Sequence, residues 1–183
     1  MQAISTLFRL FFDICRFRLG PQDIPVSQTL LVVSLAAAIL VSLAIVVVDP
    51  GVTHPVVAVS LSFLLFILFT IAVLQAFGKA SRITQTLTAL AGTDCVFSVL
   101  QFPLRFWIGQ LDPKSPEAAL PALLTLIVVG WNLLVVAHIY RHALSTRPIG
   151  GFLVTIAYFW LVISLLGLAL PTPDANVGTN VGP

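Results

Sequence analysis

Charged residues are scarce in this sequence. Lys, Arg, Asp and Glu together make up 9% of its 183 residues, and 58% of the residues are hydrophobic. Soluble chains carry about 25% charged residues, and a soluble domain of this length could not cover so much apolar surface with so few charges. The composition therefore excludes a soluble enzyme, a disordered chain and a nucleic-acid binder that relies on a large basic surface.

Cysteine is also rare. The sequence holds two, Cys15 in an Arg-rich amphipathic stretch and Cys95 within a hydrophobic one. Two cysteines so placed exclude an intramolecular disulfide framework. Palmitoylation is one interpretation of Cys15. The other is a small apolar side chain that fills space at each position.

Catalytic and cofactor-binding motifs are missing as well. Gly150-Gly151 does not follow a strand, which a nucleotide-binding loop requires, and no Gly-x-Ser-x-Gly motif or pair of catalytic carboxylates is present. His138 and His142 are four residues apart, a spacing that suits a metal, but the H-E-x-x-H pattern and a third ligand are lacking. We therefore expect no enzyme activity, no cofactor and no metal site.

Long apolar runs are what the sequence has in abundance. A transmembrane helix needs about 20 mostly apolar residues, and five stretches meet this length: residues 27–48, 55–77, 83–106, 118–140 and 150–170. The third is the weakest, because it contains Asp94, several Thr and Gln residues and, near its end, Pro103. The pattern predicts an all-α integral membrane bundle of five transmembrane helices, with residues 21–170 as the membrane domain.

Basic residues are unevenly distributed over the predicted loops, which supports counting the third stretch as a span. With five spans, seven of the nine Lys and Arg residues lie on one side, and Arg105 and Lys114 lie on the other. Because Lys and Arg resist translocation, the richer side is the cytoplasm. The seven are Arg9, Arg16, Arg18, Lys79, Arg82, Arg141 and Arg147. We expect a cytoplasmic N-terminus and a periplasmic C-terminus, and the short loops favour a bacterial inner membrane.

The first 20 residues are predicted to form an amphipathic helix. Arg9, Asp13 and Arg16 share one helical face, and Leu and Phe side chains occupy most of the remainder. Such a helix lies in the cytoplasmic membrane interface or packs beneath the spans, and the two are compatible. Residues 171–183, rich in Pro, Gly, Asn and Thr, are expected to form a flexible non-cytoplasmic tail.

Asp94 is the candidate functional residue, because it lies near the middle of the third span. A carboxylate at the bilayer centre costs about 2.5–3.5 kcal/mol on insertion scales. Ser98 and Gln101 follow at i+4 and i+7 and continue its face toward the outer surface. Asp94 is either the centre of a polar path for a proton or small solute, or an interhelical hydrogen-bonding group. Its candidate partners in the second case are polar side chains of the last two spans, Asn132, Thr155 and Tyr158.

Three short motifs lie within residues 25–170. The first is Phe77-Gly78-Lys79-Ala80-Ser81 running into Gln85-Thr86-Leu87, with Gly92 and Pro103 after it; the second is Trp131, His138 and Arg141-His142-Ala143-Leu144; the third is Gly150-Gly151. With the five spans and the cytoplasmic N-terminus, they resemble the Yip (Ypt-interacting-protein) family and its bacterial multi-pass relatives. The eukaryotic members look like membrane-organising adaptors that meet small GTPases. The resemblance implies a membrane-organising role. This chain departs from the eukaryotic pattern in having almost no cytoplasmic segment before its first span, so the resemblance gives little support to GTPase binding.

Short loops, no soluble domain and one intramembrane carboxyl group favour a non-catalytic membrane scaffold or accessory subunit, which assembles with itself or a larger membrane complex through its third and fourth spans. The first alternative is a small transporter or proton-path protein that uses Asp94, although five spans do not divide into the equal halves of an inverted repeat. The second is a lipid-handling protein whose seven cytoplasmic basic residues hold anionic headgroups, at roughly 1 kcal/mol each; topology alone also explains them. Membrane lipids and membrane proteins are the expected partners, and nucleic acid is not.

Overall fold

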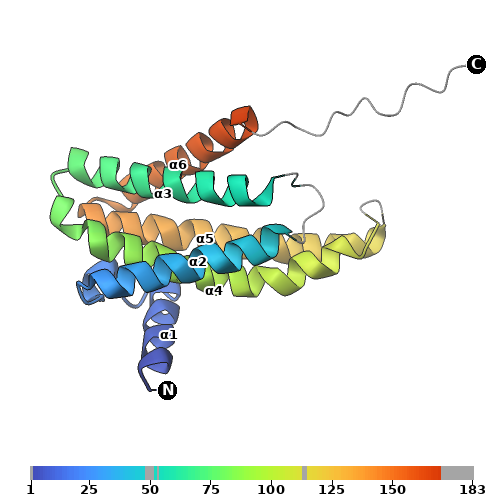
Figure 1. The fold of residues 1–183 in the computed structure, drawn as a ribbon, viewed down its shortest axis with the longest axis horizontal. Helices are drawn as coiled ribbons and strands as arrows, with labels where there is room; N and C mark the ends of the chain where they lie inside the picture. Colours follow the sequence, from blue (N-terminus) through green and yellow to red (C-terminus); the bar gives the residue numbers. More distant parts are fainter. Residues whose placement is uncertain (1, 48–51, 53, 113–114, 170–183) are drawn as a thin grey trace, which may run out of the picture.

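The computed structural model describes every residue except 1, 48–51, 53, 113–114 and 170–183. The α-helices are α1 (Gln2–Cys15), α2 (Gln28–Val47), α3 (Pro55–Ala76), α4 (Ile83–Gly109), α5 (Ala119–Leu144) and α6 (Pro148–Ala169) (Figure 1). Five of them, α2 to α6, are long and apolar enough to cross a membrane. The predicted all-α bundle of five spans with a short N-terminal helix is confirmed, and the chain is a multi-pass membrane protein. The predicted tail, residues 171–183, lies outside the described residues.

Proline and glycine set several of the helix ends. Pro55 and Pro148 stand at the first position of α3 and α6, where the missing backbone N–H has no helical partner to lose. After α3, Gly78 takes a left-handed φ of 66°, and the Lys79 amide donates to the Leu74 carbonyl at 2.7 Å. This arrangement closes the end of α3 and turns the chain toward α4.

Two spans are longer than the sequence predicts. α4 passes through Pro103 and ends at Gly109, beyond residue 106, and α5 ends at Leu144, beyond residue 140. The additional turn of α5 is stabilised at its end by Ser145, which has a left-handed φ of 55°, and by hydrogen bonds from the Arg82 guanidinium. A positive side chain there also interacts favourably with the negative end of the helix dipole.

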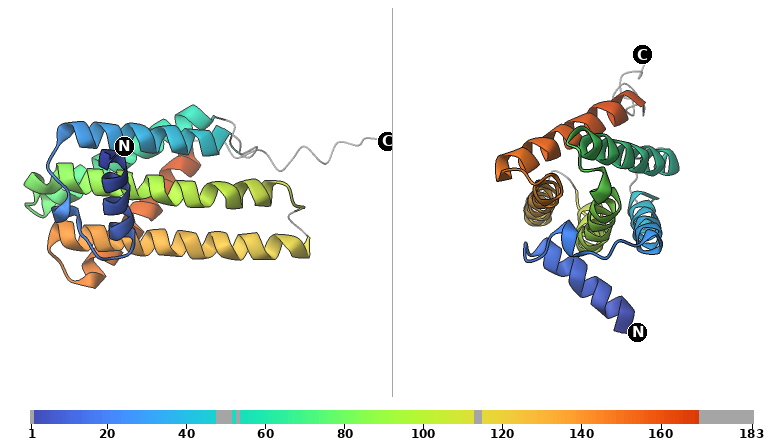
Figure 2. Two further views of the ribbon diagram at one scale, coloured as in Figure 1. Left: turned by 90° about the horizontal axis from the view of Figure 1, so that it is seen from below. Right: turned by 90° about the vertical axis from the view of Figure 1, so that its left-hand side faces the viewer.

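The five spans form two layers. In the first layer, α4 lies between α2 and α5; in the second, α3 and α6 lie side by side (Figures 1 and 2). The closest approach between the layers is where α5 meets α6. A Cβ at Gly151 of α6 would collide with the Ala137 carbonyl oxygen and the Arg141 backbone nitrogen of α5. A glycine at this position therefore allows the two backbones to pack directly, as small residues do between membrane helices.

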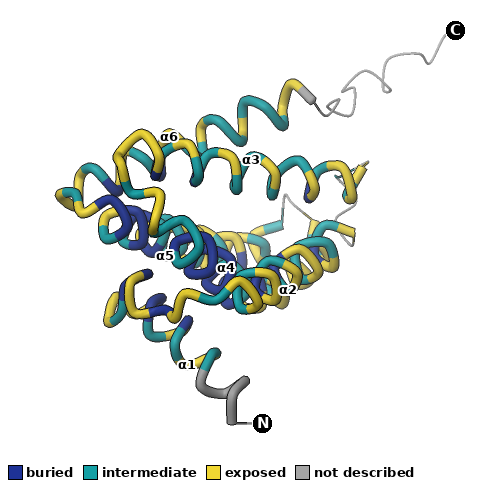
Figure 3. The backbone as a smooth tube through the Cα atoms, turned by 60° about the vertical axis from the view of Figure 1, so that its left-hand side comes forward, coloured by how far each residue is buried: buried dark blue, intermediate teal, exposed yellow. Residues whose placement is uncertain are grey.

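The central helix, α4, explains why the third span looks weak in the sequence. In its most apolar stretch 56% of the residues are buried, against 11–17% for the other spans (Figure 3). Its threonine hydroxyls donate to carbonyls one turn earlier in the same helix, Thr86 to Arg82 at 2.8 Å and Thr88 to Thr84 at 2.7 Å. These threonine side chains are thus satisfied inside the protein and do not have to face lipid.

The N-terminal helix α1 runs across the direction of the spans and packs on α4 and α5 (Figures 1 and 2). The ring of Phe11 lies against Gly92 of α4. The Trp131 indole of α5 donates to the Cys15 carbonyl at 2.9 Å, which satisfies one of the unpaired carbonyls at the end of α1. Beyond α1, the Gln85 side chain of α4 donates to the Ile24 carbonyl at 2.7 Å. The whole segment before α2 is therefore fastened to the bundle.

Candidate functional site

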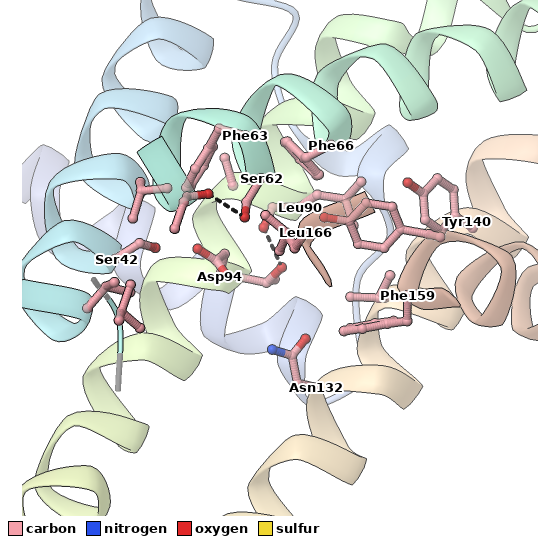
Figure 4. Close-up of a pocket in the computed structure, with 18 residues that line it drawn as sticks. Ser42, Ser62, Phe63, Phe66, Leu90, Asp94, Asn132, Tyr140, Phe159 and Leu166 are labelled. Carbon is pink, nitrogen blue, oxygen red and sulfur yellow. Dashed lines mark hydrogen bonds between the residues drawn. The ribbon is translucent and has the colours of Figure 1, made fainter. Parts of the chain in front are cut away.

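A cavity of about 460 Å³ lies between the two layers of the bundle (Figure 4). Every one of the five spans contributes to its wall, for example Ser42 of α2, Ser62 of α3, Asp94 of α4, Asn132 of α5 and Phe159 of α6. Its volume falls within the 300–1,000 Å³ typical of small-molecule sites. Most of the wall is apolar, and the polar groups are few.

The carboxyl group of Asp94 belongs to this wall. Asp94 is half-buried and lines the cavity, and the Ser42 side chain lies beside its carboxyl group (Figure 4). Asp94 is eleven residues into α4, so it lies about 16 Å from the start of the helix, near the middle of a span of about 40 Å. The cavity therefore brings an ionisable group to mid-membrane depth.

The polar lining is almost entirely uncharged. Besides Asp94, it consists of hydroxyl groups and one amide, from Ser42, Ser62, Thr93, Asn132, Tyr140 and Tyr158. Among the described residues that line the cavity, none is Lys, Arg or His. The negative charge that Asp94 carries when ionised is therefore met by dipoles in this wall, not by an opposite charge.

Tyr140 lines the cavity, and Thr70 of α3 lies behind it. Their hydroxyl oxygens are 2.9 Å apart, and both residues are 0–1% exposed. Because the Thr70 hydroxyl donates to the Phe66 carbonyl at 2.8 Å, Tyr140 is the donor in the bond between them. The Phe69 ring packs edge-on against Tyr140, with centroids 6.3 Å apart. A buried hydrogen bond and an aromatic contact thus hold Tyr140 in place in the cavity wall.

The structure separates the four residues that the sequence grouped as an intramembrane polar contact. Asp94 and Asn132 both line the cavity, whereas Ser98 and Gln101 do not. Of the other partners considered for Asp94, Tyr158 lines the cavity too. Thr155 is fully buried and donates to the Gly151 carbonyl of its own helix at 2.9 Å.

The basic residues predicted to meet lipid headgroups lie in two settings. Four flank the α3–α4 and α5–α6 turns at one end of the bundle, and three lie on or just after α1. Five of the seven are exposed: Arg9, Arg16, Arg18, Arg141 and Arg147. Lys79 is half-buried, and Arg82 donates to the His142 and Ala143 carbonyls, both at 3.0 Å, and to the Ser145 hydroxyl at 2.8 Å. Arg82 therefore has a structural role at the end of α5, whatever it does toward lipid.

The rings of His138 and His142, near the end of α5, contact each other with centroids 4.4 Å apart and planes tilted by 60°. His138 also forms a hydrogen bond between its Nε2 and the Leu19 carbonyl at 3.1 Å, so it helps to hold the segment before α2. Within the described part of the chain, no group of three or more His, Cys, Asp or Glu side chains is placed to bind a metal.

Cys15 is fully buried where α1 meets the bundle. Burial raises the pKa of its thiol to about 12, which leaves little reactive thiolate at neutral pH. Of the two interpretations of this residue, the structure favours the space-filling side chain over a lipidated one.

Several lining residues were not singled out from the sequence. They are Ser42, Ser62, Phe63, Phe66 and Phe159. Each stands in a span that is apolar all round, where periodicity marks no inner face. The one sequence feature that could have identified an inward-facing position is the small hydroxyl side chain of Ser42 and of Ser62, each within an otherwise apolar run.

Comparison of the chain with family models, with curated proteins and with solved structures gives no match. The resemblance to the Yip family therefore stays a prediction from its short motifs.

Proposed function

We propose that this multi-pass membrane protein is a small transporter and that the cavity between its two layers is the central solute site. The observation that carries the proposal is the position of Asp94. Its carboxyl group faces a cavity lined by all five spans, where a residue that only joins two helices would be enclosed between them. An ionisable group that faces a cavity inside the membrane is by default a candidate residue of a solute or proton pathway.

The architecture of the bundle supports this proposal. Transporters place their solute sites near the midplane, between groups of helices that move relative to each other. Here the site lies between the α2–α4–α5 layer and the α3–α6 layer, which meet closely at Gly151. In this proposal the hydrogen-bonded pair of Tyr140 and Thr70 is the closure at the end nearest the α3–α4 turn, and it would separate for a solute to leave by that end.

The scaffold hypothesis stays a prediction with less support from the packing. It relies on the third and fourth spans, α4 and α5, as contact helices. α4 is largely buried within its own bundle, so little of its surface is left for another protein. Contacts with another protein would then be made mainly by α5 and by α2, α3 and α6, which the scaffold hypothesis did not name.

The orientation that we propose has the N-terminus in the cytoplasm. The support is the seven-to-two distribution of Lys and Arg, with Lys79, Arg82, Arg141 and Arg147 at the same end of the bundle. Tyr140 and Thr70 then close the cavity on the cytoplasmic side. A bacterial inner membrane is the setting that the short loops favour.

Cysteine accessibility tests the transporter proposal without knowledge of the solute. In a protein with Cys15 and Cys95 replaced by Ala, Ser62→Cys introduces a thiol of nearly the same shape into the cavity wall. A small, membrane-impermeant thiol reagent should reach it from both sides, in right-side-out and in inverted vesicles, because a transporter opens to each side in turn.

The matched control is Ser98→Cys, which makes the same substitution at a buried position outside the cavity. Its thiol should stay unreactive from either side. Reaction of the Ser62→Cys protein from one side only, or from neither, would overturn the transporter proposal. Thermal unfolding of each variant shows that the fold is intact.

A further inference from the structure

We infer that the solute is a monovalent organic cation with an apolar body, such as a quaternary ammonium compound. This inference rests on the proposed transporter function and names the chemical class that its site accepts. Two features of the described part of the cavity wall carry it: one carboxyl group, that of Asp94, and a connected group of aromatic rings on the facing layer (Figure 4).

The aromatic rings belong to α3 and α6. Phe63 and Phe66 of α3 pack edge to face, with centroids 6.1 Å apart. Phe66 in turn contacts Tyr158 of α6 at 6.3 Å, and Tyr158 contacts Phe159 at 5.4 Å. All four side chains line the cavity. The rings therefore form one connected aromatic surface across the second layer.

Such a surface attracts cations. The face of an aromatic ring carries partial negative charge, so a cation near it is stabilised, and quaternary ammonium groups are bound in proteins by sets of aromatic rings. In a membrane interior the attraction is greater, because water does not compete for the cation. A neutral solute of the same shape gains the apolar contacts but not this electrostatic attraction.

The carboxyl group of Asp94 selects the same sign of charge. No basic side chain lines the described part of the cavity wall, so a bound cation would be the counter-charge for an ionised Asp94. An anion would meet the Asp94 charge and the negative faces of the rings together. The Ser42 hydroxyl beside Asp94 can orient the carboxyl group without neutralising it.

The cavity also limits the size of the solute. Its volume of about 460 Å³ accommodates a compact organic cation and excludes a whole phospholipid. The mostly apolar wall disfavours a fully hydrated inorganic ion, which would lose its water shell with few oxygen atoms to replace it. An organic cation with its charge shielded by alkyl or aryl groups meets both conditions.

Radioligand binding to the purified protein in lipid nanodiscs tests the inference. The probe is tritiated benzyltrimethylammonium, and the competitors are the unlabelled cation and neutral N,N-dimethylbenzamide, which has a similar size. We expect saturable binding that the cation displaces at least tenfold more effectively than the neutral amide. This comparison uses the unmodified protein, so it does not depend on how a variant folds.

Variants then locate the site. Asp94→Asn removes the negative charge from the cavity and should weaken binding of the probe at least tenfold. Phe66→Leu, which removes one ring, should weaken it by a smaller factor. Glu117→Gln makes the same carboxyl-to-amide change at an exposed position outside the cavity and should leave binding unchanged.

The outcomes of these experiments test the cationic class of the solute separately from the transporter proposal. Equal displacement by the cation and the amide, absence of saturable binding, or unchanged affinity in a folded Asp94→Asn protein would each overturn the cationic class. The transporter proposal would still stand if the Ser62 thiol is reached from both sides of the membrane. If that thiol is not reached from both sides, saturable cation binding would describe a receptor site in a protein that does not transport.

Discussion

Gly92 of α4 is where the N-terminal helix α1 packs closely against the bundle. The ring of Phe11 fills the space that a Cβ at this position would need, and Phe11 itself is only 9% exposed. The ring cannot move aside without uncovering apolar surface of α4. The docking of α1 therefore depends on the absence of a side chain at one position of α4.

Gly92→Ala should release α1 from the bundle. Overpacking of this kind costs about 1–3 kcal/mol, so the melting temperature in detergent should fall. In a Cys95→Ala background, Cys15 should react faster with N-ethylmaleimide, because exposure returns its pKa from about 12 toward that of a free thiol. In the parent protein the reaction should be slow at neutral pH and become faster as pH rises and the thiolate fraction increases.

Gly130→Ala is the matched control, because nothing lies within 4 Å of the Cβ that it would add. Alanine is about 0.5–1 kcal/mol more favourable than glycine inside a helix, so this variant should melt at the same or a higher temperature. Unchanged melting and unchanged Cys15 reactivity in the Gly92→Ala protein would contradict the proposed contact.

The Tyr140 hydroxyl makes a hydrogen bond that its aromatic neighbours cannot replace. Tyr140→Phe keeps the ring contact with Phe69 but removes the donor to Thr70. Hydrogen bonds between membrane helices average about 0.6 kcal/mol, and we expect a loss of that size in unfolding by denaturing detergent. Tyr158→Phe makes the same change at the cavity wall and should have a smaller effect. An equal loss in both variants would argue against the bond between Tyr140 and Thr70.

At the scale of the elements, the α5–α6 turn is stabilised by hydrogen bonds from Arg82, a side chain of the α3–α4 turn. Arg82 comes from the α3–α4 connection and donates to the His142 and Ala143 carbonyls. Through these bonds the two turns at this end of the bundle form one unit. The unit ties the start of α4 to the end of α5.

Arg82→Gln should loosen the end of α5. Hydrogen bonds from charged donors contribute about 1.5–3 kcal/mol, so amide hydrogen exchange in residues 141–149 should become at least about tenfold faster. Arg147→Gln removes an exposed positive charge in the same turn and should leave exchange almost unchanged. Equal protection of this segment in the two variants would show that the Arg82 contacts do not stabilise it.

How far the elements follow from the sequence depends on which helix is considered. Four spans could be predicted from apolar length, whereas the third needed the distribution of Lys and Arg as well. Asp94 was placed near mid-span, with Asn132 among its candidate partners. The faces of α2, α3, α5 and α6 could not be predicted, because a helix that is apolar all round shows no periodic signal. Which residues line the cavity depends on how each helix is rotated about its axis. Ser42 and Ser62 could therefore be identified as site residues only from the packed structure.

For the molecule as a whole, the central prediction is that the α3–α4 and α4–α5 connections lie on opposite sides of the membrane. Ser81 lies between α3 and α4, and Glu117 lies between α4 and α5, so a spanning α4 places them on opposite sides of the membrane. With Cys15 and Cys95 replaced, an impermeant maleimide should label Glu117→Cys in intact spheroplasts. It should label Ser81→Cys only after lysis. Labelling of both in intact cells would mean that α4 does not cross the membrane.

The central place of α4 has a consequence for how the chain enters the membrane. The two neighbours of α4 in its layer are α2 and α5. The ribosome makes α2 before α4 and makes α5 after it. While the ribosome holds the segment after Gly109, the side of α4 that packs on α5 has no protein to cover it, and this is the span least suited to lipid. We expect nascent chains arrested after residue 109 to integrate α4 less completely than chains extended past Leu144, as glycosylation-site mapping would show. Insertion and folding of this protein would then be a single event, completed only when α5 arrives.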